Sequence, residues 1–357
     1  MRPAWGIRNL NDEVLTAAAQ LGVRDVVIYG GPSAGTIPGT DQPLKKPRAS
    51  YEDYLGMRRK LESHGLRLVA IEGGFAHNPK YHDVVFGGPN RDRLINELIA
   101  EIQDMGRAGV PVYGYHWMPL LVWRTKPVRI RGGSEATAFD YEQVKHITDR
   151  RSCNEMRTAL KWGMMTCESM PERKVSEEEM WRNLEYWIKK VTPAAEKAGI
   201  RLGIHPDDPP VPELAGVPRI LRSHAAYRRL INIYPSDSNA IEFCQGTFSE
   251  MPENVYDAIR YFGSRNKILY VHFRNVSAPV PKFNEEFVDT GYVDMRKAMR
   301  TYREVGYHGV FIDDHCPALS NDAPFPGNLG GYRSRIFALG YIRALTDTAN
   351  ELRATGK

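Results

Sequence analysis

Short apolar runs alternate along the chain with longer stretches in which apolar residues recur every three or four positions. The short runs predict buried β-strands at residues 4–7, 25–29, 66–71, 111–115, 201–205, 239–244, 267–273 and 309–314. The longer stretches predict amphipathic helices at residues 11–20, 51–64, 91–108, 176–198, 217–231, 252–263, 294–305 and 332–352. Strands and helices that alternate in this way favour a (β/α)8 TIM barrel, an α/β fold, over an open doubly wound sheet.

One long stretch, residues 119–175, interrupts this alternation. It is basic and aromatic, and it is too long for a structureless connection inside a compact domain. We therefore expect an insertion after the fourth strand, with helices of its own, packed over one end of the barrel. The sequence contains no low-complexity tract and no evident linker, so residues 1–357 are predicted to form a single domain.

The composition is that of an ordinary globular protein, with 42% hydrophobic and 25% charged residues. The formal net charge is only +5, and Lys and Arg are scattered, which gives no reason to expect a nucleic acid or membrane partner. An anionic small-molecule substrate is at least as compatible with this charge. A nucleotide-binding fold has no motif in its support, because the chain lacks a Walker A loop and a GxGxxG motif after the first strand.

The N-terminal residues and the cysteine usage predict a cytoplasmic protein. Residues 1–6 lack the apolar core of a signal peptide, and no run approaches the ~18 apolar residues of a membrane span. The four cysteines form no CxxC pair, which is typical of a reducing compartment. We accordingly expect Cys153 and Cys167 to be free thiols. We also expect a homo-oligomer, most simply a dimer.

Four potential metal ligands each close an apolar run in the second half of the chain: His205, Cys244, His272 and Asp314. The active site of a TIM barrel lies at the carboxyl ends of its strands, so these side chains would meet at one end of adjacent strands. A lone strand-end histidine or buried cysteine is usually structural, and the prediction of a metal site therefore depends on their convergence. Asp313 competes with Asp314, because successive strand residues point to opposite faces.

The chemistry of the four ligands narrows the identity of the ion. A thiolate with two imidazoles favours zinc, iron(II) or cobalt, whereas a carboxylate and open coordination positions also admit manganese. His224 and His308 lie away from the carboxyl ends of the predicted strands, and we interpret them as structural.

The most specific motif in the chain is the octapeptide at residues 203–210, Gly-Ile-His-Pro-Asp-Asp-Pro-Pro. It resembles a signature of the mannonate dehydratases, the sugar-acid dehydratases of the xylose-isomerase-like barrel superfamily. Further segments that resemble this family are residues 112–119, 123–125, 177–184, 243–251 and 272–276. The resemblance extends from about Trp5 to Leu345.

This resemblance implies a manganese-type divalent ion held by His205, Cys244, His272 and Asp314. The family's Asp-His pair falls on Asp314-His315, and its later Gly-Tyr pair falls on Gly331-Tyr332. The resemblance therefore implies His315 and Tyr332 as the two proton-transfer residues, without assigning which is the base and which is the acid. General acid–base groups of this kind contribute ~10²–10⁴-fold to a reaction rate.

Other residues near the strand ends are candidates for substrate binding. Arg274 and Asn275 lie just past the seventh strand and could bind the substrate carboxylate and a hydroxyl group. The alternative for Arg274 is an ion pair with a nearby acid. His116 and Trp117 follow the fourth strand and could line the pocket by hydrogen bonding and by stacking on the sugar. Glu72, at the tip of the third strand, is a further candidate.

Dehydration of an aldonic acid removes the proton next to the carboxylate and then the β-hydroxyl, through a carbanion-like intermediate that a divalent Lewis acid stabilises. We therefore predict a metal-dependent hydro-lyase, with conversion of D-mannonate to 2-keto-3-deoxy-D-gluconate as the default reaction. An alternative is a sugar or uronate isomerase or epimerase that uses Glu72 as a second acid–base group. A third alternative is a sugar-acid binding protein without turnover, because Ile312 and Cys316 depart from the family's usual residues.

Overall fold

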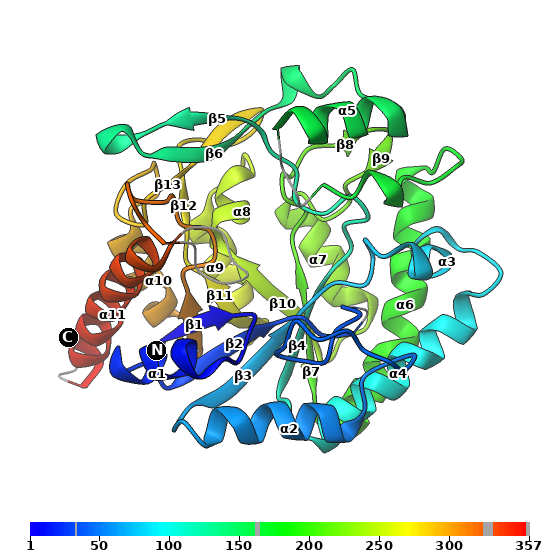
Figure 1. Cartoon of the computed structure of the whole chain (residues 1–357). Coiled ribbons are helices and arrows are strands. Elements are labelled where there is room, and N and C mark those ends of the chain that lie inside the picture. The colour runs from blue at the N-terminus through cyan, green and yellow to red at the C-terminus, as the bar shows by residue number, and fades with distance from the viewer. Residues whose placement is uncertain (33, 161–164, 324–330, 355–357) are drawn as a thin grey trace.

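The computed structural model describes residues 1–32, 34–160, 165–323 and 331–354. Its centre is a closed barrel in which all neighbouring strands are parallel, in the order β1-β14-β11-β10-β7-β4-β3-β2 (Figure 1). The barrel strands are β1 (Arg2–Ile7), β2 (Asp25–Tyr29), β3 (Arg67–Glu72), β4 (Val112–His116), β7 (Arg201–His205), β10 (Asn239–Cys244), β11 (Ile268–His272) and β14 (Val310–Ile312). The predicted TIM barrel is confirmed.

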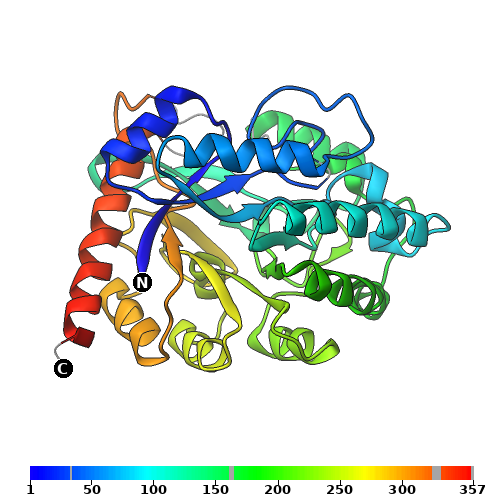
Figure 2. The same ribbon diagram turned by 90° about the horizontal axis from the view of Figure 1, so that it is seen from below.

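Helices surround the strands, as the view from below shows (Figure 2). The main helices are α1 (Asp12–Gln20), α2 (Tyr51–Glu62), α4 (Arg91–Arg107), α6 (Glu177–Ala198), α7 (His224–Ile233), α9 (Val255–Gly263), α10 (Met295–Glu304) and α11 (Tyr332–Ala354), and α3 (His82–Phe86) and α8 (Gln245–Glu250) are shorter. Local sequence sets their ends. The Ser176 side chain caps α6 by accepting the Glu179 N–H, and Gly199 ends that helix in the left-handed conformation, with φ of 70°.

The helix predicted at residues 217–231 starts later than expected. Residues Val217–Pro218 form β9, which pairs with β8 (Glu213–Leu214), and α7 begins only after its Ser223 cap. The prediction was wrong here because the loop uses the backbone donors that a helix would need. The N–H of Leu221, for example, donates to the Asp207 carboxylate at 2.7 Å.

The insertion predicted to be helical is instead mixed. It contains helix α5 (Arg150–Leu160) and a hairpin of β5 (Thr125–Arg129) and β6 (Glu135–Asp140). These strands continue into β13 (Lys282–Glu286) and β12 (Asn275–Val276), which come from the loop after β11, and the four form one antiparallel sheet in the order β12-β13-β6-β5. We call it the cap sheet, and Figure 1 shows it at the end of the barrel where β11 leads into β12.

A disulfide joins Cys153 of α5 to Cys167, which opens the short 3-10 helix Cys167–Ser169. The prediction of free thiols was therefore wrong for this pair. Spacing along the sequence gives no sign of the bond, because the fold of the insertion is what brings the two residues together. Cys244 and Cys316 are free.

Buried apolar side chains form two groups that match the architecture. One fills the barrel interior and consists of Ala4, Val27, Tyr29, Ala70, Tyr270, Val310 and Ile312. A far larger group fills the space between the strands and the helices, and includes Trp5, Trp117, Trp123 and Trp187. Among the described residues, no helix combines the length and the apolar character needed to cross a lipid bilayer.

Candidate metal and acid–base site

The register of the barrel brings the predicted ligands together at one end. Cys244 and His272 are paired across β10 and β11, and His205, at the end of β7, is paired with His116 of β4. One ligand atom from each of His205, Cys244 and His272 lies within 4.8 Å of the others, and all three residues are buried. With Asp314 we call them the four-donor cluster. The convergence expected of the two imidazoles and the thiol is therefore observed.

Hydrogen bonds orient both imidazoles of the cluster. Nδ1 of His205 lies 2.6 Å from the carbonyl oxygen of Pro206, and because a carbonyl can only accept, Nδ1 carries a proton; in the neutral ring, which is the form that binds a metal, Nε2 has the lone pair. Nε2 of His272 lies 3.0 Å from Oε2 of Glu72, and Nδ1 lies 3.2 Å from Oδ2 of Asp314. Each nitrogen of the His272 ring thus lies near a carboxylate, and orienting contacts of this kind are typical of metal-ligating histidines.

The surroundings of the Cys244 side chain favour its thiolate form. It caps α8, with Sγ accepting from the backbone N–H of Thr247 at 3.5 Å and from its hydroxyl at 3.2 Å. Burial opposes ionisation, but the positive charges of Arg274 and His205 hold the pKa of the thiol well below its usual value. Burial likewise disfavours the charged form of His205, yet Cys244 raises the pKa of that imidazole to about 10. A thiolate is the form in which cysteine binds metals.

The geometry shows which of the two neighbouring carboxylates, Asp313 or Asp314, faces the other predicted ligands. Asp314 has a φ of 52° in the left-handed region, and this turn brings its carboxylate to 3.2 Å from His272 and 3.3 Å from Nε of Arg274. Asp313 instead pairs with Nη2 of Arg335 at 2.7 Å. Burial opposes ionisation of Asp314, but the positive charges of His315 and His272 hold its pKa well below its usual value. Only Asp314 faces the cluster.

A pair of carboxylates lies beside His272, and sequence reasoning missed one of them. Glu242 is two residues before Cys244 on β10, and its Oε1 is 3.3 Å from Nε2 of His272. Its carboxylate also interacts with the hydroxyl of Tyr270. Burial and the nearby Glu72 raise its pKa well above the usual value. Strand alternation, which places residues two apart on one face, is the signal that could have identified it.

Glycine makes room for this carboxylate inside the barrel. A Cβ atom at Gly114 of β4 would lie 2.3 Å from Oε2 of Glu242 and 2.0 Å from the hydroxyl of Tyr270. Glu72, Glu242 and His272 also bring one ligand atom each within 4.8 Å, so the described residues contain two overlapping groups that could hold a divalent metal.

The two predicted proton-transfer residues are placed differently. His315 joins the cluster: its Nδ1 is 3.0 Å from Oε1 of Glu285, and its Nε2 is 3.7 Å from Oδ2 of Asp314. Tyr332 opens α11 directly after residues 324–330, which lie outside the described part of the chain. Burial and the negative charge of Glu13 raise the pKa of its hydroxyl.

Arg274 and Asn275 are both engaged by protein groups. The guanidinium of Arg274 is buried and contacts Asp208 at 2.7 Å, Glu250 at 2.9 Å and Glu285 at 3.0 Å. The amide of Asn275 donates to the carbonyl of Val293 at 2.9 Å and accepts from backbone N–H groups of residues 276 and 293. The ion-pair alternative for Arg274 is thus observed, and substrate contacts of both residues stay a prediction.

His116 and Trp117 point to opposite sides of their strand. His116 packs so closely on Gly74 that a Cβ there would lie 1.9 Å from the ring, and burial holds its pKa well below the usual value. Its Nδ1 has no hydrogen-bond partner among the described residues. Trp117 is 1% exposed, and its indole donates to the sulfur of Met180 at 3.1 Å. It belongs to the core, so the prediction that it stacks on substrate is not retained.

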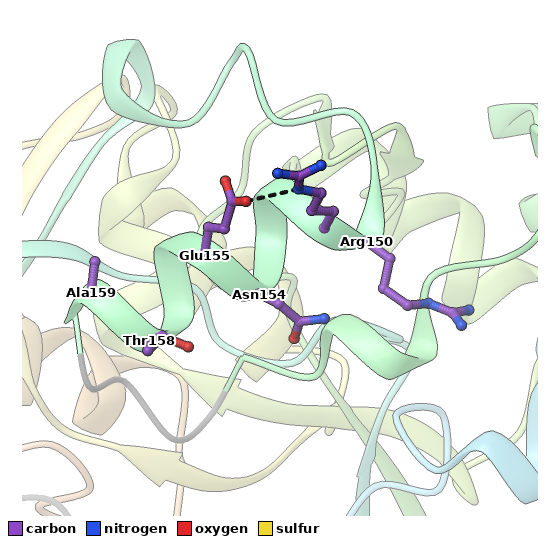
Figure 3. A pocket seen from close by; sticks show the side chains of 6 residues that line it. Arg150, Asn154, Glu155, Thr158 and Ala159 are labelled. Atoms are coloured by element: carbon purple, nitrogen blue, oxygen red, sulfur yellow. Dashed lines mark hydrogen bonds and ion pairs between the residues drawn. The ribbon is translucent and has the colours of Figure 1, made fainter.

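A separate hollow of about 840 Å³ lies along α5 (Figure 3). Its lining consists of Arg150, Arg151, Asn154, Glu155, Thr158 and Ala159. Arg151 and Glu155 pair with each other at 2.9 Å on an exposed helix face. The hollow contains no member of the four-donor cluster, and we do not associate it with catalysis.

Comparisons with known proteins identify the family of the chain. A family model described as D-mannonate dehydratase (UxuA) matches residues 15–355. The mannonate dehydratase of Streptococcus pneumoniae (strain 70585) is 32% identical over 315 residues, which cover 86% of this chain and 84% of that protein. The crystal structure of mannonate dehydratase from Streptococcus suis serotype2 superimposes with a TM-score of 0.81 at 28% identity, and the match covers 100% of this chain and 95% of that chain.

More distant structures share the fold alone. A xylose isomerase domain protein from Alicyclobacillus acidocaldarius subsp. acidocaldarius is 13% identical, with a TM-score of 0.59, and the match covers 98% of this chain and 99% of that chain. The family match includes every strand end that contributes to the four-donor cluster. The resemblance drawn from the motifs is confirmed: this chain belongs to the D-mannonate dehydratase family and is a hydro-lyase.

Proposed function

We propose that the protein dehydrates D-mannonate to 2-keto-3-deoxy-D-gluconate, and that it uses Mn²⁺ held by His205, Cys244, His272 and Asp314. The observation that carries the metal assignment is the convergence of two imidazoles and a thiol within 4.8 Å at adjacent strand ends. Family membership supports the sugar-acid substrate.

The donor set fits a divalent ion. Two imidazoles, a Cys244 thiol with a depressed pKa and the Asp314 carboxylate are all ligand types that divalent metals take, and the first three bring one ligand atom each within 4.8 Å of one another. When bound, a divalent ion acts as a Lewis acid that stabilises negative charge developing on the substrate. Iron(II), cobalt and zinc suit the same donors.

The residues around the cluster supply the proton transfers. One group must take the proton next to the carboxylate, and another must protonate the departing β-hydroxyl. We assign these steps to His315 and Tyr332, with either order open. His315 has its Nε2 on the side of Asp314, 3.7 Å from that carboxylate, and is therefore adjacent to the proposed metal.

Other polar groups at the same end are proposed to recognise the substrate. His116 is kept neutral by burial, and its free Nδ1 can exchange a hydrogen bond with a sugar hydroxyl. We further propose that Arg274 and Asn275 contribute to carboxylate and hydroxyl recognition, and that Glu72 acts by holding His272. The isomerase alternative, which needed Glu72 as an acid–base group, is less favoured because Glu72 is already paired with His272 and Tyr270.

A product assay tests the proposal. The Mn²⁺-loaded protein is incubated with a panel of aldonates and uronates, and 2-keto-3-deoxy acids are detected with time. We expect product from D-mannonate. Failure to dehydrate any aldonate, together with interconversion of a keto sugar, would replace this proposal by the isomerase. Binding without turnover would support the non-catalytic alternative.

We also propose a homodimer that works in the cytoplasm; the Cys153–Cys167 disulfide removes cysteine usage as support for this location. Light scattering of the purified protein over a range of concentrations tests the first part, and a mass equal to one chain would refute it.

A further inference from the structure

A carboxylate of the cap sheet, that of Glu285, contacts His315, the proposed catalytic histidine. Glu285 lies on β13, and its side chain is almost completely buried. Its Oε1 lies 3.0 Å from Nδ1 of His315. The contact joins two distant segments of the chain, because Glu285 belongs to the loop after β11 and His315 follows β14.

The partners of Glu285 keep it ionised. Its carboxylate contacts Nη2 of Arg124 at 2.6 Å and Nη1 of Arg274 at 3.0 Å and 3.1 Å. Burial opposes ionisation, but these two guanidiniums lower the pKa of Glu285 to about 2. An ionised carboxylate can only accept hydrogen bonds. The hydrogen atom between Glu285 and His315 therefore belongs to Nδ1 of the imidazole.

The other nitrogen of His315 faces the proposed metal. Its Nε2 is 3.7 Å from Oδ2 of Asp314, on the side of the four-donor cluster. A neutral ring whose Nδ1 carries the proton has its lone pair on Nε2. Nε2 can then accept a proton from substrate while Nδ1 keeps its own, and the resulting imidazolium lies beside the Glu285 carboxylate. A carboxylate that holds a catalytic histidine in one tautomer and orientation acts in the same way in hydrolase triads.

We propose that Glu285 is a positioning residue, which holds His315 in the Nδ1–H tautomer so that Nε2 exchanges protons with the substrate. The proposal rests on the proposed function in one respect, the action of His315 on substrate. The tautomer itself depends only on the contacts of Glu285, and it can be tested without turnover.

The first test is spectroscopic and uses the wild-type protein. Long-range ¹H–¹⁵N correlation spectra of zinc-loaded protein with ¹⁵N-labelled histidine identify the tautomer of each ring, and the His315→Asn variant assigns the signal. Spectra are recorded at a pH at which the ¹⁵N shifts of His315 show a neutral ring. We expect the Nδ1–H pattern. An Nε2–H pattern would overturn the proposal whether or not the protein dehydrates mannonate.

The second test uses kinetics with a matched control. Glu285→Gln replaces an acceptor-only group by an amide that can donate, so kcat should fall by about 10²–10⁴-fold through loss of the correct tautomer. Metal content and KM should change less than about threefold. Glu250→Gln changes another buried carboxyl of the same network, which pairs with Arg274 at 2.9 Å and does not touch His315. Burial and the nearby Asp208 raise the pKa of Glu250, so this variant tests the hydrogen bonding of the network and leaves its charge nearly unaltered. This control should keep most of the activity.

The outcomes are distinguishable from one another. Equal losses in the Glu285 and Glu250 variants, or an unchanged His315 tautomer in Glu285→Gln, would overturn the positioning role. If wild-type protein dehydrates no aldonate, the proposed function fails, and the tautomer spectrum still decides the role of Glu285. If Glu285→Gln does not fold, the wild-type spectrum is decisive.

Discussion

Two buried charged regions lie next to each other at the carboxyl end of this barrel, and they differ in the kinds of side chain that they bring together. In the cap network, which consists of Arg124, Asp208, Glu250, Arg274 and Glu285, the carboxylates of Asp208 and Glu285 each contact both guanidiniums. Although burial opposes ionisation, Arg124 and Arg274 lower the pKa of Asp208. In the neighbouring region, the imidazoles of His205 and His272 and the thiol of Cys244 each bring one potential ligand atom within 4.8 Å of the others.

Because of this difference, we interpret the cap network as a scaffold and the neighbouring region as a binding site. An arginine has no lone pair to offer a metal, and its buried ion pairs fix the segments that carry them. Imidazole nitrogens and a thiolate, in contrast, are ligands that divalent metals take. We therefore infer that the cap network holds the cap sheet on the barrel, and we propose the four-donor cluster as the site of the ion. The following predictions test this division.

The largest effect is expected from removing a ligand of the cluster. Cys244→Ala and His272→Ala should lose bound Mn²⁺ and lower kcat by about 10³-fold or more, because a metal contributes several kcal/mol and each ~1.4 kcal/mol is a factor of ten. Elemental analysis after dialysis measures the metal, and the product assay measures kcat.

Cys316→Ala is the matched control, since Cys316 is the other free cysteine and its sulfur lies 3.7 Å from the Asp313 carboxylate, away from the cluster. It should keep both metal and activity. Undiminished metal in the Cys244 and His272 variants would show that the cluster is not the metal site.

The next largest effect is expected from breaking the cap network. Arg124→Met leaves Asp208 and Glu285 short of one guanidinium, and loss of one partner from a buried ion pair costs about 3–5 kcal/mol of unfolding free energy. Urea unfolding measures the change. Arg131→Met removes an exposed arginine that pairs with Asp289, and it should cost no more than about 1 kcal/mol. Similar losses in both variants would contradict a scaffold role for the network.

Another buried acid, Glu101 of α4, lies outside both regions and should make stability depend on pH. It accepts a hydrogen bond from the Tyr54 hydroxyl at 2.7 Å, and burial raises its pKa to about 7. Between the unfolded pKa near ~4.3 and the folded value, the folded protein holds a proton that the unfolded chain releases. The unfolding free energy should therefore fall as the pH rises through this range, by roughly 3 kcal/mol in total.

Glu101→Gln should remove this contribution, because the amide does not ionise. Urea unfolding of both proteins at about pH 5 and about pH 8 gives the comparison, and the difference between the two profiles isolates Glu101 from other titrating groups. Parallel profiles for wild type and variant would mean that Glu101 ionises without cost in the folded protein.

The smallest effect is expected from the carboxylate that orients His272. Glu72→Gln should weaken metal affinity by about 10–100-fold, as loss of an orienting partner of a metal-ligating histidine commonly does. Chelator competition with Zn²⁺ measures it. Tyr270→Phe removes the other hydrogen bond to Glu72, at 3.2 Å, and keeps the ring whose centroid lies 5.6 Å from that of His272, so it should cost less. Equal losses would mean that Glu72 does not act through His272.

The barrel and the converging donors could be predicted because both follow from local patterns. Short apolar runs between helical stretches specify parallel strands, and the side chain that ends each run lies at a common rim. The same alternation rule could have identified Glu242 from Cys244, and it could have placed Trp117 on the face opposite His116. The sequence therefore contained the signal for Glu242 and for Trp117, and the alternation rule was not applied to either residue.

The cap sheet and the disulfide could not be predicted in this way. Strand β6 pairs with β13, for example Phe139 with Phe283, and nothing near either strand identifies its partner. Cys153 and Cys167 meet only because the insertion folds back on itself. The contact between Glu285 and His315 depends on that long-range sheet, so it became visible only with the structure.

The cap sheet also has a consequence for the order in which the protein can be made. Its hairpin β5–β6 emerges from the ribosome well before β13, and until then the edge of β6 has no partner. An unpaired strand edge is a template for association with other chains. We therefore expect slow or arrested translation between these strands to increase association of nascent chains through the edge of β6 more than an arrest after β13.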